Sequence, residues 1–188
     1  MAASATTGKG YFTPTGEMSS ARSLHTATEL PNGDVLIAGG YDTTLATLAT
    51  LASAEIYDPI TGLFTPTGSM GAARVAAEAT QLRNGKILMV RGQDASGNAL
   101  ASVELFDPIT GTFSPTGSLL TARLNPTVTL LGNGRVLVAG GYEGTSRGTP
   151  LASAEIYKPG PVVLWRRVRC RRPAGTQRPH CYEMALFW

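Results

Sequence analysis

Short segments with strand character alternate along this chain with clusters of Gly, Pro, Asn and Asp. Residues 25–30 and 34–38 are two such segments, and the dipeptide Asn32-Gly33 lies between them. Asn-Gly favours a type I′ turn, because both central residues of that turn need a positive φ, which Gly and Asn tolerate best. We therefore predict a β-hairpin whose strands cover residues 25–30 and 34–38.

The same hairpin signal recurs at Asn84-Gly85 and Asn133-Gly134, which lie 52 and 49 residues further along. The second strand of each hairpin is an apolar run, VLIAGG, ILMVRGQ or VLVAGG, and such a run is typical of a strand buried on both faces. Terminal glycines allow close backbone approach or a positive φ. We expect a structural role for Gly39, Gly40, Gly92, Gly140 and Gly141.

A longer stretch repeats as well, and it supplies two more strands to each unit. Leu51–Met70 (LASAEIYDPITGLFTPTGSM) returns at Leu100–Leu119 with 14 of 20 positions identical, and it begins again at Leu151 but stops matching after Pro159. It predicts a third strand at 52–57, a turn at 58–62 and a fourth strand at 63–67. Self-similarity at a fixed period near 50 residues indicates a repeat architecture.

These repeats divide the chain into parts. Residues 1–9 are expected to be disordered, and residues 10–18 (GYFTPTGEM) repeat only the end of the long stretch, which predicts an isolated fourth strand. Two full units at 19–70 and 71–119, an incomplete unit at 120–159 and a tail at 160–188 without the repeat follow.

Four strands per unit, a double glycine after the second strand and an aromatic pair around an Asp-Pro-x-Thr-Gly turn resemble the kelch repeat. The aromatic pairs are Tyr57 with Phe64 and Phe106 with Phe113. The resemblance covers about residues 10–159, is closer to bacterial tandem kelch repeats than to animal adaptors, and implies an all-β fold, the kelch-type β-propeller. The chain supplies about three four-stranded blades, whereas propellers typically have four to eight. We expect either a fragment of a six- or seven-bladed propeller or self-association of copies that completes the ring.

The tail differs sharply from the repeats in composition. It holds six Arg against one Glu and both cysteines, whereas residues 1–161 hold ten Lys and Arg against twelve Asp and Glu. Such an abrupt change is typical of translation in a shifted reading frame; the alternative is a basic interaction tail for nucleic acid or an anionic membrane. The near-neutral body has no basic stripe for phosphates, so we expect no nucleic-acid partner.

Compartment and membrane signals are absent from the sequence. The N-terminus has no apolar run of the signal-peptide kind, and no segment approaches the roughly 18 apolar residues of a membrane span. We expect no membrane span and a cytoplasmic location for the chain as written, and export stays open if the chain is a piece of a longer protein.

The most regular polar feature is an arginine before each first strand and a glutamate within each third strand. They are Arg22, Arg74 and Arg123 with Glu55, Glu104 and Glu155. Equal numbers at one period predict structural ion pairs, partly buried, that fix a blade edge or a seam between blades. The kelch resemblance implies a second role that is compatible with the first. Arginines at this place in some kelch adaptors line the channel mouth and bind acidic peptides, beside the loops at 41–50, 93–99 and 142–150.

Other candidate chemistry is sparse. His25 has no nucleophile or Asp partner at a readable spacing, so a packed core residue is the better interpretation. Two His and two Cys assemble no metal site, and we expect no cofactor. The leading interpretation is a non-catalytic module that binds a protein or glycan ligand through the loop face. The alternatives are a fragment of a kelch-type carbohydrate enzyme, a sugar oxidase or sialic-acid isomerase, and a structural secreted or surface repeat protein.

Overall fold

The computed structural model describes residues 10–42, 49–145, 148–160, 162–168 and 181–187. It divides into two compact bodies, an N-terminal body at Met1–Tyr157 and a C-terminal body at Lys158–Trp188. Every regular element in the described ranges is a β-strand, so the protein is all-β. No helix among these residues is long and apolar enough to cross a membrane.

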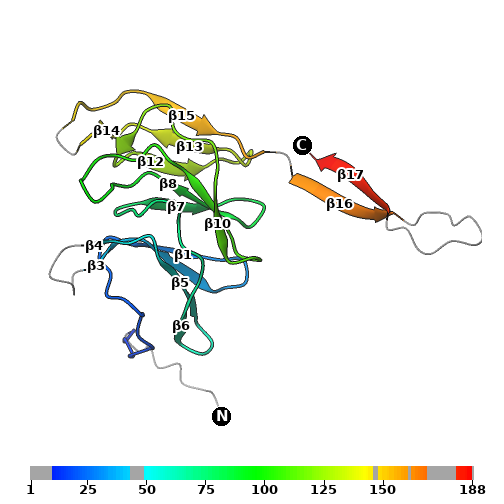
Figure 1. Ribbon diagram of the computed structural model, residues 1–188, viewed down its shortest axis with the longest axis horizontal. Helices are drawn as coiled ribbons and strands as arrows, with labels where there is room; N and C mark the ends of the chain where they lie inside the picture. The colour runs from blue at the N-terminus through cyan, green and yellow to red at the C-terminus, as the bar shows by residue number, and fades with distance from the viewer. Residues whose placement is uncertain (1–9, 43–48, 146–147, 161, 169–180, 188) are drawn as a thin grey trace, which may run out of the picture. The chain divides into compact units, whose positions relative to one another are not determined.

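Three antiparallel sheets, one for each repeat unit, make up most of the N-terminal body (Figure 1). The first sheet has the order β1-β2-β5-β6, with β1 at Thr26–Glu29, β2 at Val35–Ala38, β5 at Ala54–Asp58 and β6 at Leu63–Pro66. The second repeats it with β7 at Glu78–Gln81, β8 at Ile87–Val90, β9 at Glu104–Asp107 and β10 at Thr112–Pro115. The third holds β12 at Thr127–Leu130, β13 at Val136–Ala139 and β15 at Ala154–Tyr157.

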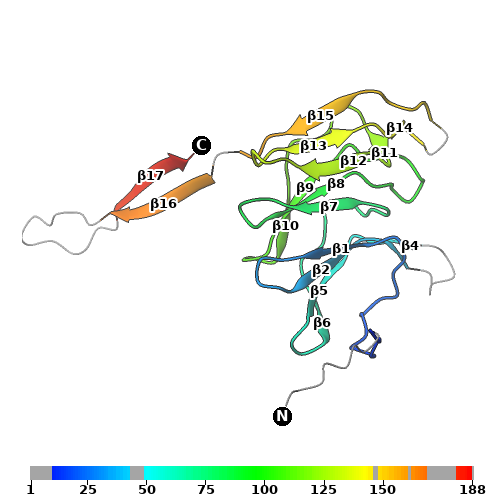
Figure 2. The ribbon, with the colours of Figure 1, turned by 180° about the vertical axis from the view of Figure 1, so that it is seen from behind.

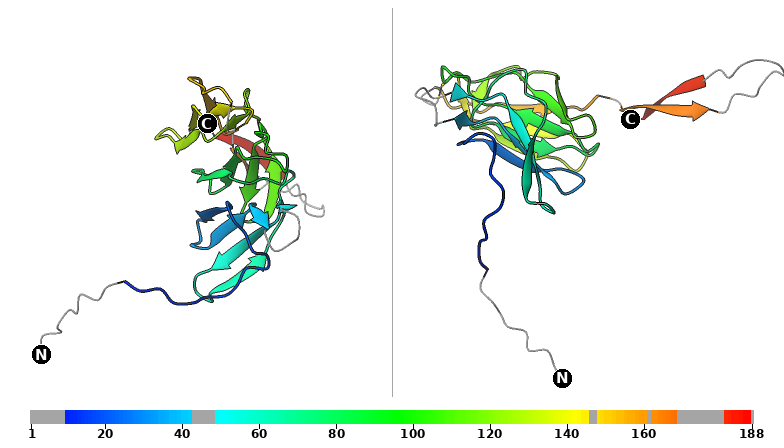
Figure 3. Two further views of the ribbon diagram at one scale, coloured as in Figure 1. Left: turned by 90° about the vertical axis from the view of Figure 1, so that its left-hand side faces the viewer. Right: turned by 60° about the horizontal axis from the view of Figure 1, so that its bottom comes forward.

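The sheets stack with their first strands side by side, because β1 contacts β7 and β7 contacts β12 (Figure 3). One apolar cluster, which includes Leu36, Ile87 and Phe106, lies between the first and second sheets. A second cluster, which includes Leu88 and Val136, joins the second sheet to the third. The second strands β2 and β8 are therefore buried on both faces, and all four residues of β8 are buried. The hydrophobic pattern predicted this burial. In β13 only Val136 and Val138 are buried and the other two residues are half-buried, because no further sheet covers its other face among the described residues.

The hairpin turns differ from the predicted type I′ geometry. In the first, the N–H of Gly33 donates to the carbonyl of Leu30 at 2.9 Å, and only Gly33 of the two central residues has a positive φ, 91°. The loop is therefore a three-residue turn that ends in a left-handed glycine. Gly85 and Gly134 repeat this geometry, although Arg83 and Gly132 stand where the first turn has Pro31. The length of the loop explains the difference, because the N–H of Leu30 donates to the carbonyl of Asp34 and leaves three residues between them, and three-residue hairpin loops are typically a type I turn followed by a left-handed residue.

Two further expectations differ from the structure. Residues 10–18, predicted as a strand, form no strand, because no described segment pairs with them along their length. The loops that follow the double glycines carry short ladders instead of plain loop structure. These are β3 (Tyr41–Asp42) with β4 (Ala49–Thr50), and β11 (Arg123–Leu124) with β14 (Tyr142–Glu143). The expectation for residues 1–9 lies outside the described residues.

The C-terminal body contains one antiparallel pair in its described residues, β16 (Val162–Val168) with β17 (Cys181–Phe187), drawn in orange and red in Figure 2. Its register begins with Val162 opposite Phe187 and ends with Val168 opposite Cys181. Neither strand belongs to any of the three repeated sheets.

Each unit also places a non-glycine residue in the left-handed region just before its first strand. Leu24, Ala76 and Asn125 have φ values of 55°, 50° and 48°. The N–H of Ala76 donates to the carbonyl of Leu24 at 2.9 Å, so this strained backbone links the first unit to the second. Arg91 has the same conformation, with a φ of 54°, at the position that Gly39 occupies in the first unit. The conformation belongs to the repeat and does not depend on a glycine.

Replacing Ala76 with Gly should therefore stabilise the protein. A non-glycine residue in the left-handed region costs about 1–2 kcal/mol, and the added freedom of the unfolded chain offsets part of that gain. We expect Ala76→Gly to raise the free energy of unfolding by about 0.5–1 kcal/mol in urea denaturation. The matched control Ala79→Gly, within β7, should lower it by a similar amount. A loss of stability for both variants would contradict this account of Ala76.

Candidate functional site

The side chain of Arg74 is fully buried and uses all of its donors within its own unit. Its NH2 group donates to the Oε1 of Glu104 at 2.6 Å and to the Oγ of Ser102 at 3.2 Å. Its NH1 group donates to the carbonyls of Ser102 at 2.9 Å and Arg91 at 3.2 Å, and its Nε donates to the carbonyl of Ala72. One side chain thus ties together the linker, the second strand and the third strand of its sheet.

The other two units repeat the contact. The guanidinium of Arg22 lies 2.8 Å from the carboxylate of Glu55, and that of Arg123 lies 2.7 Å from the carboxylate of Glu155. Both arginine side chains are 1% exposed, and both also donate to the serine two residues before the glutamate. The spacing of arginine and glutamate in the sequence predicted these pairs.

Each glutamate binds the linker that leads into its own unit. One oxygen of Glu55 accepts the N–H of Ser19 at 2.9 Å, and one oxygen of Glu155 accepts the N–H of Leu120 at 2.7 Å. Burial by itself would raise the pKa of Glu55 and of Glu155, but the backbone N–H groups and the paired arginine outweigh it. The net pKa of both carboxyls is lowered. Both side chains are therefore held as carboxylates in the folded protein.

The arginines consequently present no free donor to a ligand. All five N–H groups of Arg74 have acceptors inside the unit, and its burial lowers its pKa against the opposing attraction of Glu104. Direct binding of an acidic peptide by Arg22, Arg74 or Arg123 stays a prediction. The geometry instead gives these side chains a positioning role beneath the loops.

The loops that follow the second strands lie together at one end of the sheets, to the left in Figure 1. The N–H of Ala99 in the second unit donates to the carbonyl of Gly144 in the third at 2.8 Å, so neighbouring loops are in contact. Asp94 closes its own loop by accepting the N–H groups of Ser96 and Asn98 at 2.8 and 2.9 Å. We call residues 41–42, 49–50, 93–99, 142–145 and 148–150 the loop end.

Arg91 is the charged side chain that departs from the repeat at this end. It donates to the Oε2 of Glu78 at 2.9 Å and to the Oδ1 of Asn125 at 3.3 Å. Glu78 belongs to the second unit and Asn125 to the third, so Arg91 bridges two sheets beside their first strands. The other units have Gly39 and Gly140 here, which makes the surface of the second unit different from its neighbours.

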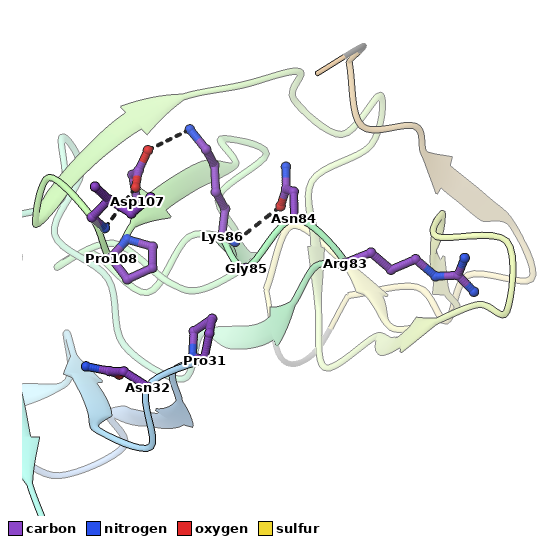
Figure 4. Close-up of a pocket in the computed structure, with 9 residues that line it drawn as sticks. Pro31, Asn32, Arg83, Asn84, Gly85, Lys86, Asp107 and Pro108 are labelled. Atoms are coloured by element: carbon purple, nitrogen blue, oxygen red, sulfur yellow. Dashed lines mark hydrogen bonds and ion pairs between the residues drawn. The ribbon is translucent and has the colours of Figure 1, made fainter. Parts of the chain in front are cut away.

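The opposite end of the sheets holds a pocket of about 490 Å³ between the hairpin turns of the first and second units (Figure 4). It is lined by Pro31, Asn32, Arg83, Asn84, Gly85, Lys86, Asp107, Pro108 and Ile109. Lys86 and Asp107 form an ion pair of 2.9 Å at its edge, and this pair lowers the pKa of Asp107. Arg83 extends away from the pocket and donates to the carbonyl of Gly132.

Sequence reasoning missed this pocket. Its walls come from two hairpin turns that lie 52 residues apart and from the Asp-Pro turn of the second unit, and only the stacking of the sheets brings the two units together. One available signal was the change from PNGD in the first unit to RNGK in the second, which adds two cations to a turn.

His25 lies at the beginning of the first sheet, where its Nδ1 is buried without a hydrogen-bond partner among the described residues. Within that same part of the chain, no group of three or more His, Cys, Asp and Glu side chains could hold a metal ion. His180 and Cys170 lie outside the described residues.

No family model matches the chain, and no curated protein matches it. The fold and the repeated contacts define an all-β protein built from similar antiparallel sheets.

The lowered pKa of Glu55 and Glu155 predicts a loss of stability in acid. A folded-state pKa below the ordinary value of 4.5 means that both carboxylates stabilise the fold above that pH, and this contribution disappears as the pH falls through the folded-state value. We expect the free energy of unfolding, measured in urea from neutral pH to about pH 3, to fall.

The double variant Glu55→Gln with Glu155→Gln should be less stable at neutral pH but should lose less stability on acidification. Part of the acid sensitivity will stay, because Asp58 and Asp107 also have lowered pKa values. An equal loss in the variant and the unmodified protein would contradict the assignment.

Proposed function

We propose that this protein is a kelch-type β-propeller module without catalytic activity, which binds a protein or glycan ligand through its loop end. Three similar sheets with adjacent first strands support the propeller, in which each sheet is one blade. The resemblance of the repeats to kelch units supports the family assignment. A double glycine follows the second strand in the first and third sheets, and an aromatic pair and an Asp-Pro turn occupy the same places in the first and second sheets.

The observation that carries the binding proposal is a contrast between framework and loops. The arginine, serine and glutamate contacts are the same in all three units, whereas the segments that follow the double glycines differ in sequence. Binding residues are disproportionately found on loops that a rigid scaffold positions. Buried arginines that hold the ends of the second and third strands would give the variable loops a fixed base.

The chemistry of the loop end favours a polar ligand. The described loop residues include Asp94, Asn98 and Glu143, and Tyr142 adds a ring that is 38% exposed. Carboxylates, amides and an aromatic ring are the groups that recognise sugar hydroxyls or the polar side chains of a partner surface. Arg91 adds a guanidinium beside the first strands, with an exposed fraction of 14%.

A test would screen the purified protein against a glycan array and a displayed random-peptide library, and then measure the selected binders against two variants. The loop variant replaces Asp94, Asn98 and Tyr142 with Ala. The control variant replaces Ile60 and Ile109 with Ser in the Asp-Pro turns, which are 94% and 93% exposed at the other end of the sheets.

We expect binding to weaken at least about tenfold in the loop variant and to change little in the control, since a few residues usually carry most of the binding energy. Similar circular dichroism spectra would show that both variants fold. Ligands whose binding weakens only in the control variant would place the site at the opposite end and overturn this assignment.

A further inference from the structure

In its described residues, the N-terminal body contains a segment with the sequence of a fourth strand that pairs with no third strand, and a third strand that has no fourth strand. Residues 10–14 have the sequence of a fourth strand, and β15 is a third strand without a fourth strand beside it in the described part of the chain. In the first two sheets the fourth strand pairs along the outer edge of the third, as β6 does with β5 and β10 does with β9. An unpaired strand edge is a template for another strand.

The segment at 10–18 already lies where the end of a fourth strand lies in the repeat. The N–H of Gly16 donates to the carbonyl of Gly62 at 2.9 Å, and the N–H of Gly68, at the end of β6, donates to the carbonyl of Gly111 at the same distance. The hydroxyl of Thr15 lies 3.1 Å from the carbonyl of Gly62, as that of Thr67 does from Gly111. Residues 15–16 thus make the same contacts with the first sheet that residues 67–68, which follow β6, make with the second sheet.

Phe12, which precedes residues 15–16, has no described ring partner like those of the equivalent residues in the first two sheets. Tyr11 is 86% exposed and Phe12 is 105% exposed, although the equivalent Phe64 is only partly exposed and packs its ring 4.7 Å from that of Tyr57. Phe113 makes the same contact with Phe106 at 4.8 Å. The exposure of Phe12, at a place where Phe64 and Phe113 are packed in both full units, indicates a missing partner.

The edge of β15 shows the corresponding deficit. Ile156 is 42% exposed, and Tyr157 has no ring partner among the described residues, whereas the equivalent Tyr57 and Phe106 each have one. Residues 160–168 do not carry the Gly-x-Phe-x-Pro pattern that provides the fourth strand in the other units. The hydroxyls of Tyr157 and Thr116 already share a hydrogen bond of 3.1 Å, as those of Tyr57 and Thr15 do at 3.0 Å, so the rest of this seam is in place.

We propose that residues 10–14 of a second copy of this chain pair with β15 as its fourth strand. The register of β5 with β6 places Phe12 opposite Tyr157, Thr13 opposite Ile156 and Pro14 opposite Glu155. A second copy is required because the second sheet lies between the first and the third, which keeps the N-terminal segment of a chain away from its own β15. Reciprocal donation by two copies pairs both unpaired edges and gives six sheets, a number within the range of closed propellers.

The register can be tested by disulfide trapping between two single-cysteine chains. In full-length protein with Cys170→Ser and Cys181→Ser, Thr13→Cys chains are mixed with affinity-tagged Ile156→Cys chains and oxidised. Opposed strand residues lie about 4.5–5.5 Å apart at their Cα atoms, a separation that a disulfide spans. We expect a tagged product of two chains. The matched control uses Ile56→Cys, whose place in β5 is equivalent but whose edge is taken by Thr65 of β6, and it should give none.

Sedimentation of the protein with intact cysteines gives an independent measure of the same contact. We expect self-association that Phe12→Glu weakens at least about tenfold, because a buried aromatic pair is lost. The exposed Phe12 contributes no packing within one chain, so the variant should keep its fold, which circular dichroism checks. A protein that stays monomeric up to about 100 μM, or equal trapping at Ile156 and Ile56, would overturn the proposal.

Discussion

The buried contact between an arginine of the linker and a glutamate of the third strand is the interaction on which each sheet depends. In the second unit, Arg74 reaches Glu104, Ser102 and the carbonyl of Arg91, while Glu104 accepts the N–H of Gly71. Removing two charges from water is expensive, and only a full set of hydrogen bonds offsets that loss. The value of the contact therefore lies in its geometry, since it fixes where the linker, the second strand and the third strand meet.

Close packing beside this contact explains the glycines. A Cβ added at Gly39 would lie 2.5 Å from the carbonyl oxygen of Arg74, and one added at Gly40 would lie 2.6 Å from that of Ser23. In the first unit, the second strand therefore ends in two residues without side chains where these backbone segments pass. The second unit accommodates Arg91 at the place of Gly39, and its side chain extends to Glu78 and Asn125 and bridges two sheets.

Most of the fold could be predicted from the sequence because it is set by local patterns that repeat. The apolar second strands, the third and fourth strands and the pairing of Arg22 with Glu55 all follow from periodicity. The turn type was missed because the Asn-Gly pair was read as a two-residue loop, whereas strand pairing closes a three-residue loop between Leu30 and Asp34. Pairing of β3 with β4 was missed because two-residue strands carry too little pattern to detect.

What periodicity could not supply is contact between units. The pocket beside Lys86 and the bridge made by Arg91 exist only once the sheets stack, and their residues are the ones that break the repeat. The loop end is similar, since its sequence differs from unit to unit and offers no pattern to extrapolate. Here the repeat shows which residues are scaffold, and the departures from it show where the units become distinct.

A double-mutant cycle on Arg74 and Glu104, measured as the free energy of unfolding in urea, tests the central claim most directly. Each single change to Ala leaves a buried partner unsatisfied and should cost about 3–5 kcal/mol. The double variant should cost less than the sum, with a coupling of about 2–3 kcal/mol between the two residues. Costs that add within about 0.5 kcal/mol would show that the two side chains act independently and would contradict the account.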